Sequence, residues 1–531
     1  MPSDCISFKD TGYFSKLICN YLAEAEMLKP LYNRFPNIDN FKAQIEEKST
    51  FYSQESRSVL VQVLKKQYKS LETSEDTLIN INALSKNTTF TVTTGHQLNL
   101  FTGPLYFLHK IVSTINLAKQ LKAKYPKNNF VPIYWMASED HDFEEINYFN
   151  FKGKKIQWNR EASGAVGELN TKGLEAVFNV FSKELGIGKN ADRLRELFKK
   201  AYLEHNNLAD ATFYLANQLF KENGLVIIEA NNKDLKQLFI PYVEKELIEQ
   251  ISKQKVLETN AKIEALDFKI QVNPRLINLF YITESVRERI VLENDVYKVL
   301  NTTISWNKNE ILKEVNDFPE RFSPNVILRP LYQEVILPNL CYIGGGGELA
   351  YWFQLKENFK AFNVVLPMLL LRNSVLIKTK QQANKLERLN ITNKDIFLKR
   401  ESFINKKVRE ISNIDIDFSS QIMHLENQFL ALHELAKQTD ESFVGAVTAQ
   451  EKKQIKGLKN LEKRLLKAQK RKLKDHVTRI TDLQNQLFPN NSLQERNTNF
   501  SELYLEFGDD LIPELLANLE PLKGEFTVLT I

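Results

Sequence analysis

The chain has 531 residues, of which 43% are hydrophobic and 26% are charged, and its formal net charge is +5. These proportions exclude an intrinsically disordered or fibrous chain and indicate a folded globular protein. Because one hydrophobic core rarely organises more than about 300 residues, we expect one large core with further segments inserted or appended.

Membrane association and metal binding are not indicated. The longest apolar run, Val364–Leu371, is far shorter than the about 20 residues that cross a bilayer, and the first residues lack the apolar stretch of a signal peptide. We therefore expect a cytoplasmic protein. Cys5, Cys19 and Cys341 are too few and too widely spaced for a disulfide framework or a zinc site, so no metal site is predicted.

Residues 1–87 carry apolar residues at intervals of three and four, which predicts a helical N-terminal lead-in. Residues 88–150 then read as the strand "NTTFTVTTG", a glycine-containing turn, a helix that begins near Pro104, and the strand "NFVPIYWMAS". A strand, helix and strand in this order imply a parallel sheet with helices on its faces. We predict the first half of a parallel-sheet core, and hence the α/β class.

Residues 151–220 contain charged, helix-forming segments and predict a connecting helical insertion. The apolar run "GLVIIEA", residues 224–230, is typical of a buried parallel strand. Two further core strands, with a glycine-rich loop and a helix between them, are predicted between residues 321 and 377. We assign residues 221–377 to the second half of the core.

Residues 378–500 predict an α-helical coiled-coil domain, and residues 501–531, which end in "FTVLTI", a C-terminal segment that returns to the core. From Leu458 to Leu487 apolar residues recur at near-heptad spacing. The one step of five residues, which ends at Leu473, predicts a local change in winding.

The coiled-coil segment is also strongly basic. Between Lys452 and Arg479, twelve Lys and Arg residues stand against two acids. No aromatic side chain is interleaved with them, whereas surfaces that bind single-stranded nucleic acid combine both types. Pairing of two subunits is therefore the favoured role, contact with a polyanion is secondary, and nucleic-acid binding is not expected.

Polar residues follow the first predicted core strand, at the sheet edge where parallel α/β proteins bind ligands. The next helix directs its N-terminal dipole toward the same edge, which favours an anion. His109 on that helix is interpreted as a core residue. The residues predicted to bind an anion or substrate here are Thr94, Gly95, His96, Gln97, Thr102, Gly103, Tyr106 and Lys110.

A second cluster, Glu139 to Asp142, directly follows the second core strand. Carboxylates around an imidazole raise its pKa, bind a metal or hold a substrate amine. Helix capping is the alternative interpretation; it accounts for Glu144 and Glu145 but does not require a histidine. The predicted catalytic residues are His141, Asp140, Glu139 and Asp142, with Asn147 as a binding residue.

The third cluster is a run of four glycines between a predicted strand and a helix. Consecutive glycines are useful where φ is positive or where a ligand approaches the backbone closely, although a plain turn is the alternative. No Gly-Lys-Ser/Thr follows, so this is not a Walker A loop. The residues predicted to bind phosphate, carboxylate or substrate here are Arg329, Gln333, Glu334, Gly344, Gly345, Gly346, Gly347, Glu348, Tyr351, Trp352 and Arg372.

Four stretches in this order, "TGHQLNLFTGPLYFLHK", "WMASEDHDFEEIN", "RPLYQEVILPNLCYIGGGGELAYW" and "LPMLLLRNS", closely resemble the BshC family, the cysteine-adding enzymes of bacillithiol biosynthesis. The resemblance covers essentially the whole chain. It implies a Rossmann-like, nucleotidyltransferase-like core that is also akin to class I aminoacyl-tRNA synthetases, and a coiled coil that pairs two subunits. The chain departs from the family pattern at His96, where Gln is more frequent, and at Gly346, where Pro is common, which makes His141 the stronger catalytic candidate.

The resemblance implies a ligase that joins the carboxylate of cysteine to the amine of glucosaminyl malate, the last step of bacillithiol synthesis. Because this condensation is unfavourable in water, activation by ATP or another nucleotide is expected. The acidic cluster with His141 would bind and deprotonate the amine, and Arg329 and Arg372 would hold malate or phosphate. The alternatives are a synthetase-like nucleotide- or RNA-binding protein and a non-catalytic coiled-coil scaffold.

Overall fold

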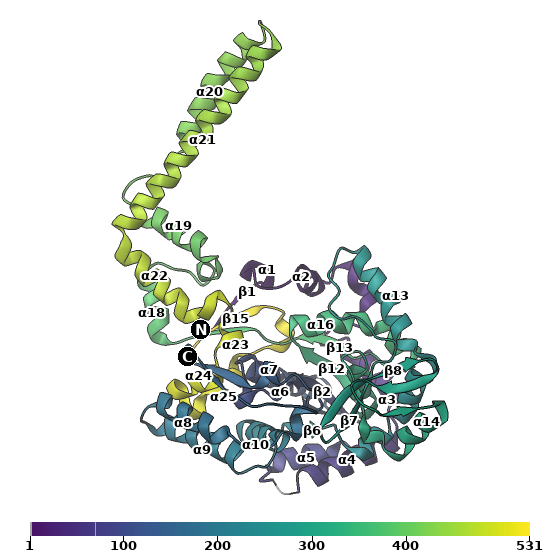
Figure 1. The fold of residues 1–531 in the computed structure, drawn as a ribbon. Coiled ribbons are helices and arrows are strands. Elements are labelled where there is room, and N and C mark those ends of the chain that lie inside the picture. Colours follow the sequence, from purple (N-terminus) through teal and green to yellow (C-terminus); the bar gives the residue numbers. More distant parts are fainter. Residues whose placement is uncertain (1–2, 70) are drawn as a thin grey trace. The chain divides into compact units, whose positions relative to one another are not determined.

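The computed structural model of the protein describes residues 3–69 and 71–531, which form two compact units (Figure 1). The first unit runs to Ile377 and resumes at Leu493. The second comprises Lys378–Ser492.

The first unit is built on a five-stranded sheet in the order β13-β12-β2-β3-β6, in which every neighbouring pair is parallel. Its strands are nearly continuous apolar runs, as expected for a parallel sheet covered by helices on both faces. The predicted Rossmann-like α/β core is confirmed. The strands are β2 (Thr89–His96), β3 (Asn129–Met136), β6 (Val226–Glu229), β12 (Asn339–Gly344) and β13 (Met368–Leu371).

The strand order reverses between β2 and β12. From β2 the chain builds β3 and then β6 to one side, and afterwards returns to place β12 and β13 on the other side. In open α/β sheets such a switch point opens a crevice at the carboxyl ends of the two strands. The segments after β2 and β12, which carry two of the predicted polar clusters, therefore flank one crevice.

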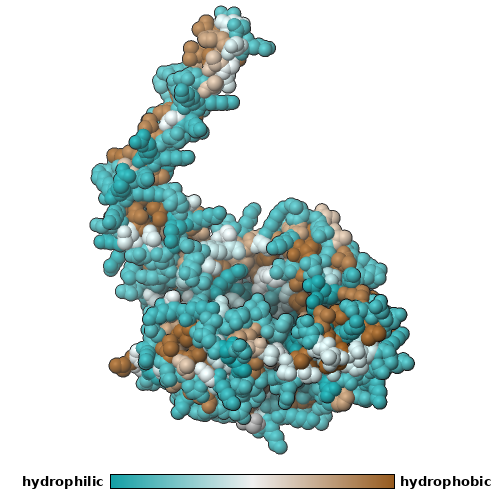
Figure 2. Space-filling view, viewed as in Figure 1, coloured by the Kyte–Doolittle hydropathy of each residue, from teal (hydrophilic) through white to brown (hydrophobic). Residues whose placement is uncertain are grey.

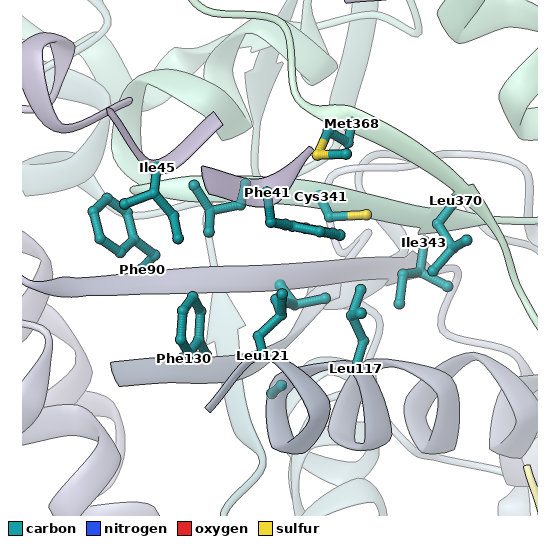
Figure 3. Packing of buried hydrophobic residues seen from close by; sticks show 13 residues of the cluster. Phe41, Ile45, Phe90, Leu117, Leu121, Phe130, Cys341, Ile343, Met368 and Leu370 are labelled. Carbon is teal, nitrogen blue, oxygen red and sulfur yellow. The ribbon is translucent and has the colours of Figure 1, made fainter. Parts of the chain in front are cut away.

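Helices cover both faces of the sheet. In Figure 3, Phe41 and Ile45 of α3 (Phe41–Phe51) lie on one side of the strands, and Leu117 and Leu121 of α6 (Tyr106–Lys124) lie on the other. Both sets belong to one buried apolar cluster. The other helices of this region are α11 (Lys233–Gln237), α12 (Ile240–Glu249), α13 (Ile251–Ala265), α14 (Lys308–Asp317), α15 (Arg329–Ile336), α16 (Gly346–Trp352) and α17 (Lys356–Ala361).

The N-terminal segment is mainly helical but begins with a strand that the sequence does not predict. β1 (Ser3–Ile6) pairs antiparallel with β15 (Phe526–Thr530), in a sheet of order β1-β15-β14 with β14 (Val375–Lys378). The C-terminal strand thus lies in this small sheet rather than at an edge of the core sheet. The helices of the lead-in are α1 (Phe8–Thr11), α2 (Lys16–Leu22), α4 (Gln54–Gln67) and α5 (Glu75–Ala83), besides α3.

Between β3 and β6 the chain forms the short helix α7 (Phe143–Ile146), a hairpin and three helices. The hairpin pairs β4 (Tyr148–Phe151) with β5 (Lys154–Gln157). The helices are α8 (Leu174–Leu185), α9 (Lys189–Leu203) and α10 (Leu208–Phe220), in the segment for which the sequence predicts a helical insertion.

A second, antiparallel sheet interrupts the segment that we assigned entirely to the core. Its order is β10-β9-β8-β7-β11. Polar and apolar residues alternate in "VRERIVLE", and Asn294 and Asp295 in the following turn both have positive φ. β8 and β9 therefore form a local hairpin in which the two strands hydrogen-bond to each other. The strands are β7 (Leu279–Thr283), β8 (Val286–Glu293), β9 (Val296–Val299), β10 (Ser305–Trp306) and β11 (Phe322–Pro324).

The second unit is helical. Its longest helices, α20 (Ser419–Ala436) and α21 (Glu441–Lys472), are joined by four residues and pack against each other (Figure 1). The near-heptad segment is divided at Leu473, where α21 ends and α22 (Lys474–Leu487) begins, at the five-residue step. Two helices precede the pair, α18 (Lys380–Arg388) and α19 (Arg400–Ile411).

After this unit the chain returns through α23 (Gln494–Asn497), α24 (Phe500–Phe507) and α25 (Leu511–Asn518). Across the described residues, none of the helices combines the length and the apolar character needed to span a bilayer.

Candidate active site

A cavity of about 810 Å³ lies in the first unit, at the carboxyl edge of the parallel sheet. Residues that follow β2, β3, β12 and β13 line it, together with residues from β8 and α23. All three predicted clusters contribute to it. The predicted residues in the lining are Gly95, His96, Gln97, Tyr106, Lys110, Glu139, Asp140, Arg329, Gly345, Gly346, Gly347, Glu348, Tyr351 and Arg372.

Glu348 organises the side of the cavity above β12. Its carboxylate pairs with Lys110 Nζ at 2.7 Å and accepts hydrogen bonds from the Gly345 N–H at 2.8 Å and the Tyr342 hydroxyl at 2.7 Å. Burial acts to raise the pKa of Glu348, but Lys110 and these donors together lower it, so the carboxylate stays ionised. Lys110 also donates to the Gly95 carbonyl at 2.7 Å, which joins the segments after β2 and β12.

Arg329 forms no ion pair with a carboxylate among the described residues. Its guanidinium donates to the Gln333 side chain at 3.2 Å and the Tyr351 hydroxyl at 3.0 Å, both neutral groups. Behind it, Gln333 donates to Glu334, and Glu334 forms an ion pair with Lys48 in which both side chains are fully buried. Gln333 and Glu334, predicted to bind ligand directly, therefore lie outside the cavity and support Arg329 from within the core.

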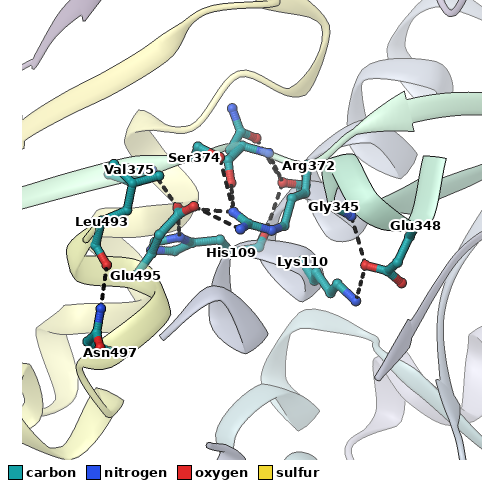
Figure 4. Close-up of polar contacts among 12 residues, drawn as sticks. His109, Lys110, Gly345, Glu348, Arg372, Ser374, Val375, Leu493, Glu495 and Asn497 are labelled. Atoms are coloured by element: carbon teal, nitrogen blue, oxygen red, sulfur yellow. Dashed lines mark hydrogen bonds and ion pairs between the residues drawn. The ribbon is translucent and has the colours of Figure 1, made fainter. Parts of the chain in front are cut away.

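Arg372 lies above β13 and is 5% exposed. Glu495 of α23 binds two of its guanidinium nitrogens, at 3.0 and 2.8 Å (Figure 4). The same carboxylate contacts His109 Nδ1 at 3.2 Å, so His109 is a fully buried structural residue, as the sequence indicates.

The carboxylates of the cavity follow β3. Gln97 donates from its amide nitrogen to Asp140 at 3.0 Å and to Glu145 at 2.9 Å, which ties both to the end of β2. Burial would raise the pKa of Asp140, but hydrogen bonds from His141 and Gln97 and the charge of Arg287 lower it well below its ordinary value. Glu139, in contrast, forms an ion pair with the buried Lys236.

His141 does not line the cavity. Its side chain is 51% exposed, its ring lies 5.5 Å from the Phe280 ring, and its Nδ1 contacts the guanidinium of Arg287 at 2.5 Å. Asp142, at the start of α7, lies outside the cavity as well. The two residues are adjacent in sequence to Asp140, but the chain turns away from the cavity after it.

His96, which the sequence comparison made less central, is 7% exposed and lines the cavity. Burial lowers the pKa of its ring to about 3, so the ring is neutral at pH 7. One ring nitrogen bonds the Thr102 backbone and Nε2 has no partner within the described residues. Because a neutral imidazole has one donor and one acceptor nitrogen, Nε2 is left as a buried acceptor in a side chain that lines the cavity.

The glycines of the third cluster serve close approach and not a left-handed backbone, since none of Gly344 to Gly347 has positive φ. A Cβ on Gly344 would lie 2.9 Å from the Tyr342 ring, whereas one on Gly347 would meet nothing within 4 Å. The N–H groups in the first turn of α16 have no intrahelical acceptor. Gly347 therefore offers open backbone to the cavity.

The remaining predicted residues have structural roles outside the cavity. Thr94 donates to the Ile343 carbonyl at 2.7 Å and joins β2 to β12. Gly103 has φ of 63°, and a Cβ there would lie 2.6 Å from Asn99. Thr102 and Asn147 are buried, and Trp352 stacks on Tyr342 with ring centroids 4.5 Å apart.

Several lining residues escaped the sequence analysis. Arg287 comes from the antiparallel sheet, Arg496 from the returning C-terminal segment, and Glu145 was interpreted as a helix cap. No local pattern marks the two arginines, because each reaches the cavity through contacts with segments far away in sequence. Among the described residues, no group of three or more His, Cys, Asp and Glu side chains has the arrangement of a metal site.

Comparison with known proteins agrees with this architecture. Residues 1–373 match the family model described as "Bacillithiol biosynthesis BshC, N-terminal Rossmann-like domain", and residues 375–531 match "Bacillithiol biosynthesis BshC, C-terminal coiled-coil domain". The chain belongs to the BshC family.

Relatives in the BshC family align over nearly the entire chain. The proteins named "Putative cysteine ligase BshC" from Christiangramia forsetii and Flavobacterium johnsoniae are 60% and 58% identical to it, over 100% of this chain and 99% and 100% of their own lengths. The protein of the same name from Bacillus thuringiensis is 27% identical over 97% of each chain.

The boundary between the two BshC models differs from the division of the structure. The C-terminal model starts at residue 375 and includes Glu495 and Arg496. In the structure both residues belong to the first unit, and Arg496 lines the cavity.

Proposed function

We propose that this chain is a ligase that forms an amide bond between the carboxylate of cysteine and the amine of glucosaminyl malate, in the last step of bacillithiol biosynthesis. Membership of the BshC family and the name shared by its relatives support this reaction. The observation that carries the proposal is that arginine guanidinium groups and carboxylates without a lysine or arginine ion pair among the described residues, Asp140 and Glu145, line one cavity at different strand ends, which suits a substrate with a dicarboxylate and an amine.

The cationic side of the cavity lies over β12 and β13. Arg329 precedes β12, and Arg372 follows β13. The carboxylates of Asp140 and Glu145 follow β3 instead. Three strand spacings separate β13 from β3, about 14 Å in all. We propose that a molecule with carboxylates at one end and an amine at the other binds with its carboxylates toward Arg329 and Arg372 and its amine toward Asp140 and Glu145.

Asp140 and Glu145 are the groups that we propose to hold the amine. The low pKa of Asp140 keeps it ionised at neutral pH, and a carboxylate is the natural partner of an ammonium group. A carboxylate so acidic is a weak base, so its role is to bind and orient. Deprotonation of the amine by His141 stays a prediction from the sequence.

The cationic side also fits a phosphate group. Arg329 has no carboxylate partner among the described residues, and the backbone at Gly347 is open. We propose that ATP or another nucleotide supplies the activation of the cysteine carboxylate. The residues that would hold its phosphates are Arg329, Arg372, Gly346 and Gly347.

A homodimer is proposed through the hairpin of α20 and α21. Large apolar side chains on these helices remain exposed, and Figure 2 shows them as brown patches among hydrophilic residues. They are Met423, Leu430, Leu432, Leu435, Phe443 and Leu461.

The reaction is tested by incubating the purified protein with glucosaminyl malate, cysteine and ATP, and detecting the ligated thiol by mass spectrometry. We expect the product only when all three are present. Asp140→Asn is expected to lose at least about 100-fold in kcat/KM because it removes the charge that holds the amine. Glu161→Gln, at an exposed carboxylate outside the cavity lining, is the control and is expected to keep wild-type activity.

Two outcomes would contradict the proposal. Absence of the product with every nucleotide and thiol donor tried would eliminate the ligase reaction. Normal activity in Asp140→Asn would leave the reaction but reject Asp140 as the group that holds the amine. His141→Ala in the same assay tests the predicted proton transfer.

A further inference from the structure

We propose that residues 493–499, the segment that follows the helical hairpin unit, are a working part of the active site. In this proposal Glu495 is a positioning residue that fixes Arg372, and Arg496 is a specificity residue that binds an anionic group of the ligand. The geometry of the segment carries the inference, and only the identity of the natural ligand rests on the proposed function.

Glu495 is fully buried, and four nitrogen donors contact its carboxylate (Figure 4). Arg372 donates to its two oxygens at 3.0 and 2.8 Å, His109 Nδ1 lies 3.2 Å away, and the Val375 N–H donates at 3.0 Å. Burial alone would raise the pKa of Glu495, but Arg372 and His109 lower it well below its ordinary value. The carboxylate is therefore a permanent anion that holds the guanidinium in one orientation.

Among the guanidinium nitrogens of Arg372, only Nε has no partner within the described residues. Both terminal nitrogens are occupied, by Glu495 and by the Asn373 carbonyl and Ser374 hydroxyl. The Nε–H is buried, has no partner within the described residues, and belongs to a side chain that lines the cavity. A buried donor without a partner is costly, so a ligand atom is the expected acceptor.

Arg496 adds a second guanidinium beside the first. It is exposed at the cavity, and within the described part of the chain its side chain makes no ion pair. A planar guanidinium with free donors binds carboxylate and phosphate groups in bidentate fashion. Since Glu495 and Arg496 are adjacent in α23, the residue that fixes Arg372 also fixes the backbone from which Arg496 extends.

The other end of the segment is anchored to the loop between β2 and α6. The Leu105 N–H donates to the Thr498 carbonyl at 2.8 Å, and the Asn499 amide donates to the carbonyls of Phe101 and Gly103 at 2.7 and 2.6 Å. The segment thus holds two walls of the cavity at once. Arg496 lies between these anchors, so its backbone is fixed relative to the cavity.

The chemistry shared by the expected ligands is an oxyanion with two or more charges. The malate carboxylates of the sugar substrate and the phosphates of a nucleotide both fit. Two probes separate these sources. We propose titration calorimetry of the full-length protein with malate and, separately, with inorganic pyrophosphate.

Three variants complete the design. Glu495→Gln keeps the size of the side chain but replaces one acceptor oxygen by a donor that faces Arg372, His109 or Val375. Arg496→Gln removes the guanidinium at the cavity. Arg193→Gln removes an arginine that is 60% exposed and lies outside the cavity, and it serves as the matched control.

We expect the wild-type protein to bind at least one probe, and both cavity variants to bind it about 10-fold or more weakly, because each loses a charge-assisted contact. Arg193→Gln should bind as the wild type does. Equal binding by the wild-type protein, Glu495→Gln and Arg496→Gln would overturn the proposal, as would failure of the wild-type protein to bind either probe.

Kinetics separate positioning from a general structural effect. If the ligase reaction is found, Glu495→Gln should raise KM for the substrate whose probe is affected by about 10-fold and leave KM for the other substrates unchanged. A variant that was only destabilised would lower the amount of active protein without changing one KM selectively, and that result would overturn the role of Glu495. If the reaction fails, the binding experiments still decide the proposal.

Discussion

His96 ends β2 and Glu229 ends β6, the two strands on either side of β3; His96 is buried and Glu229 is half-buried. Burial moves both toward the neutral form, with a pKa of about 3 for His96 and about 7 for Glu229. For His96 the consequence is a buried acceptor nitrogen in a side chain that lines the cavity. For Glu229 the consequence is that the folded protein becomes less stable as the pH rises and the carboxyl ionises, since its Oε2 has no partner within the described residues.

We predict that His96→Gln retains activity and His96→Leu loses it. The Gln side-chain oxygen replaces the acceptor at Nε2, whereas Leu fills similar volume without an acceptor and leaves the ligand donor unpaired, at a cost of about 1 to 3 kcal/mol. Steady-state kinetics of the two variants check this. Equal activity in both would show that Nε2 contacts no ligand.

Glu229→Gln should stabilise the protein at pH 8 and match the wild type near pH 5. The folded carboxyl keeps its proton up to about pH 7, while its ordinary pKa is 4.5, so the free energy of unfolding falls as the pH rises through this window. We expect a gain of about 1 to 3 kcal/mol at pH 8. Chemical denaturation at both pH values measures it, with the exposed Glu161→Gln as control; a gain of the same size at pH 5 would reject the ionisation argument.

At the scale of elements, the turn from β12 into α16 places the backbone of Gly345 to Gly347 in the lining of the cavity. Gly347→Ala should stabilise α16 by about 0.5 to 1 kcal/mol, as alanine does within a helix. It should nevertheless weaken ligand binding, because the new Cβ enters space at the cavity that no other described residue fills.

Gly445→Ala is the matched variant for this prediction. Gly445 also lies in a helix with open space around it, but in α21, which contributes no residue to the lining of the cavity. We expect the same gain in stability and no change in activity, as judged by thermal denaturation and turnover. Wild-type turnover in Gly347→Ala would exclude Gly347 from ligand contact.

The sequence predicted elements well where local patterns decide them. The apolar runs of β2, β3 and β6 and the polar ends of β2 and β3 are visible without a structure. The antiparallel sheet was missed although the turn at Asn294 and Asp295 is a recognisable hairpin signal. β1 has no comparable signal, because its four residues form a strand only by pairing with β15 at the other end of the chain.

The same limit applies to the residues predicted for the site. Spacing alone grouped Asp140 with His141, but the backbone turns between them, and only Asp140 faces the cavity. Glu334 carries a charge in a polar stretch, yet its partner Lys48 is 286 residues away in sequence. Glu495 is likewise defined by contacts with residues more than 100 positions distant.

At the scale of the whole molecule, the exposed apolar residues of α20 and α21 predict a dimer. A double change, Leu430→Glu with Leu435→Glu, should shift the mass measured by light scattering from twice the chain mass to the chain mass and leave the helix content unchanged. Both side chains are more than half exposed, so the folded chain tolerates the charges. Gln421→Glu with Asn427→Glu, at exposed polar positions of the same helix, should remain dimeric; a monomeric wild-type protein would contradict the prediction.

The central claim is that the cavity at the switch point between β2 and β12 holds an amine at one side and an oxyanion at the other. A crystal structure of the protein with glucosaminyl malate tests it most directly. We predict the amine within about 3 Å of the Asp140 or Glu145 carboxylate, and the malate carboxylates on Arg329, Arg372 or Arg496. Binding outside the cavity, or with the malate at the Asp140 side, would contradict the account.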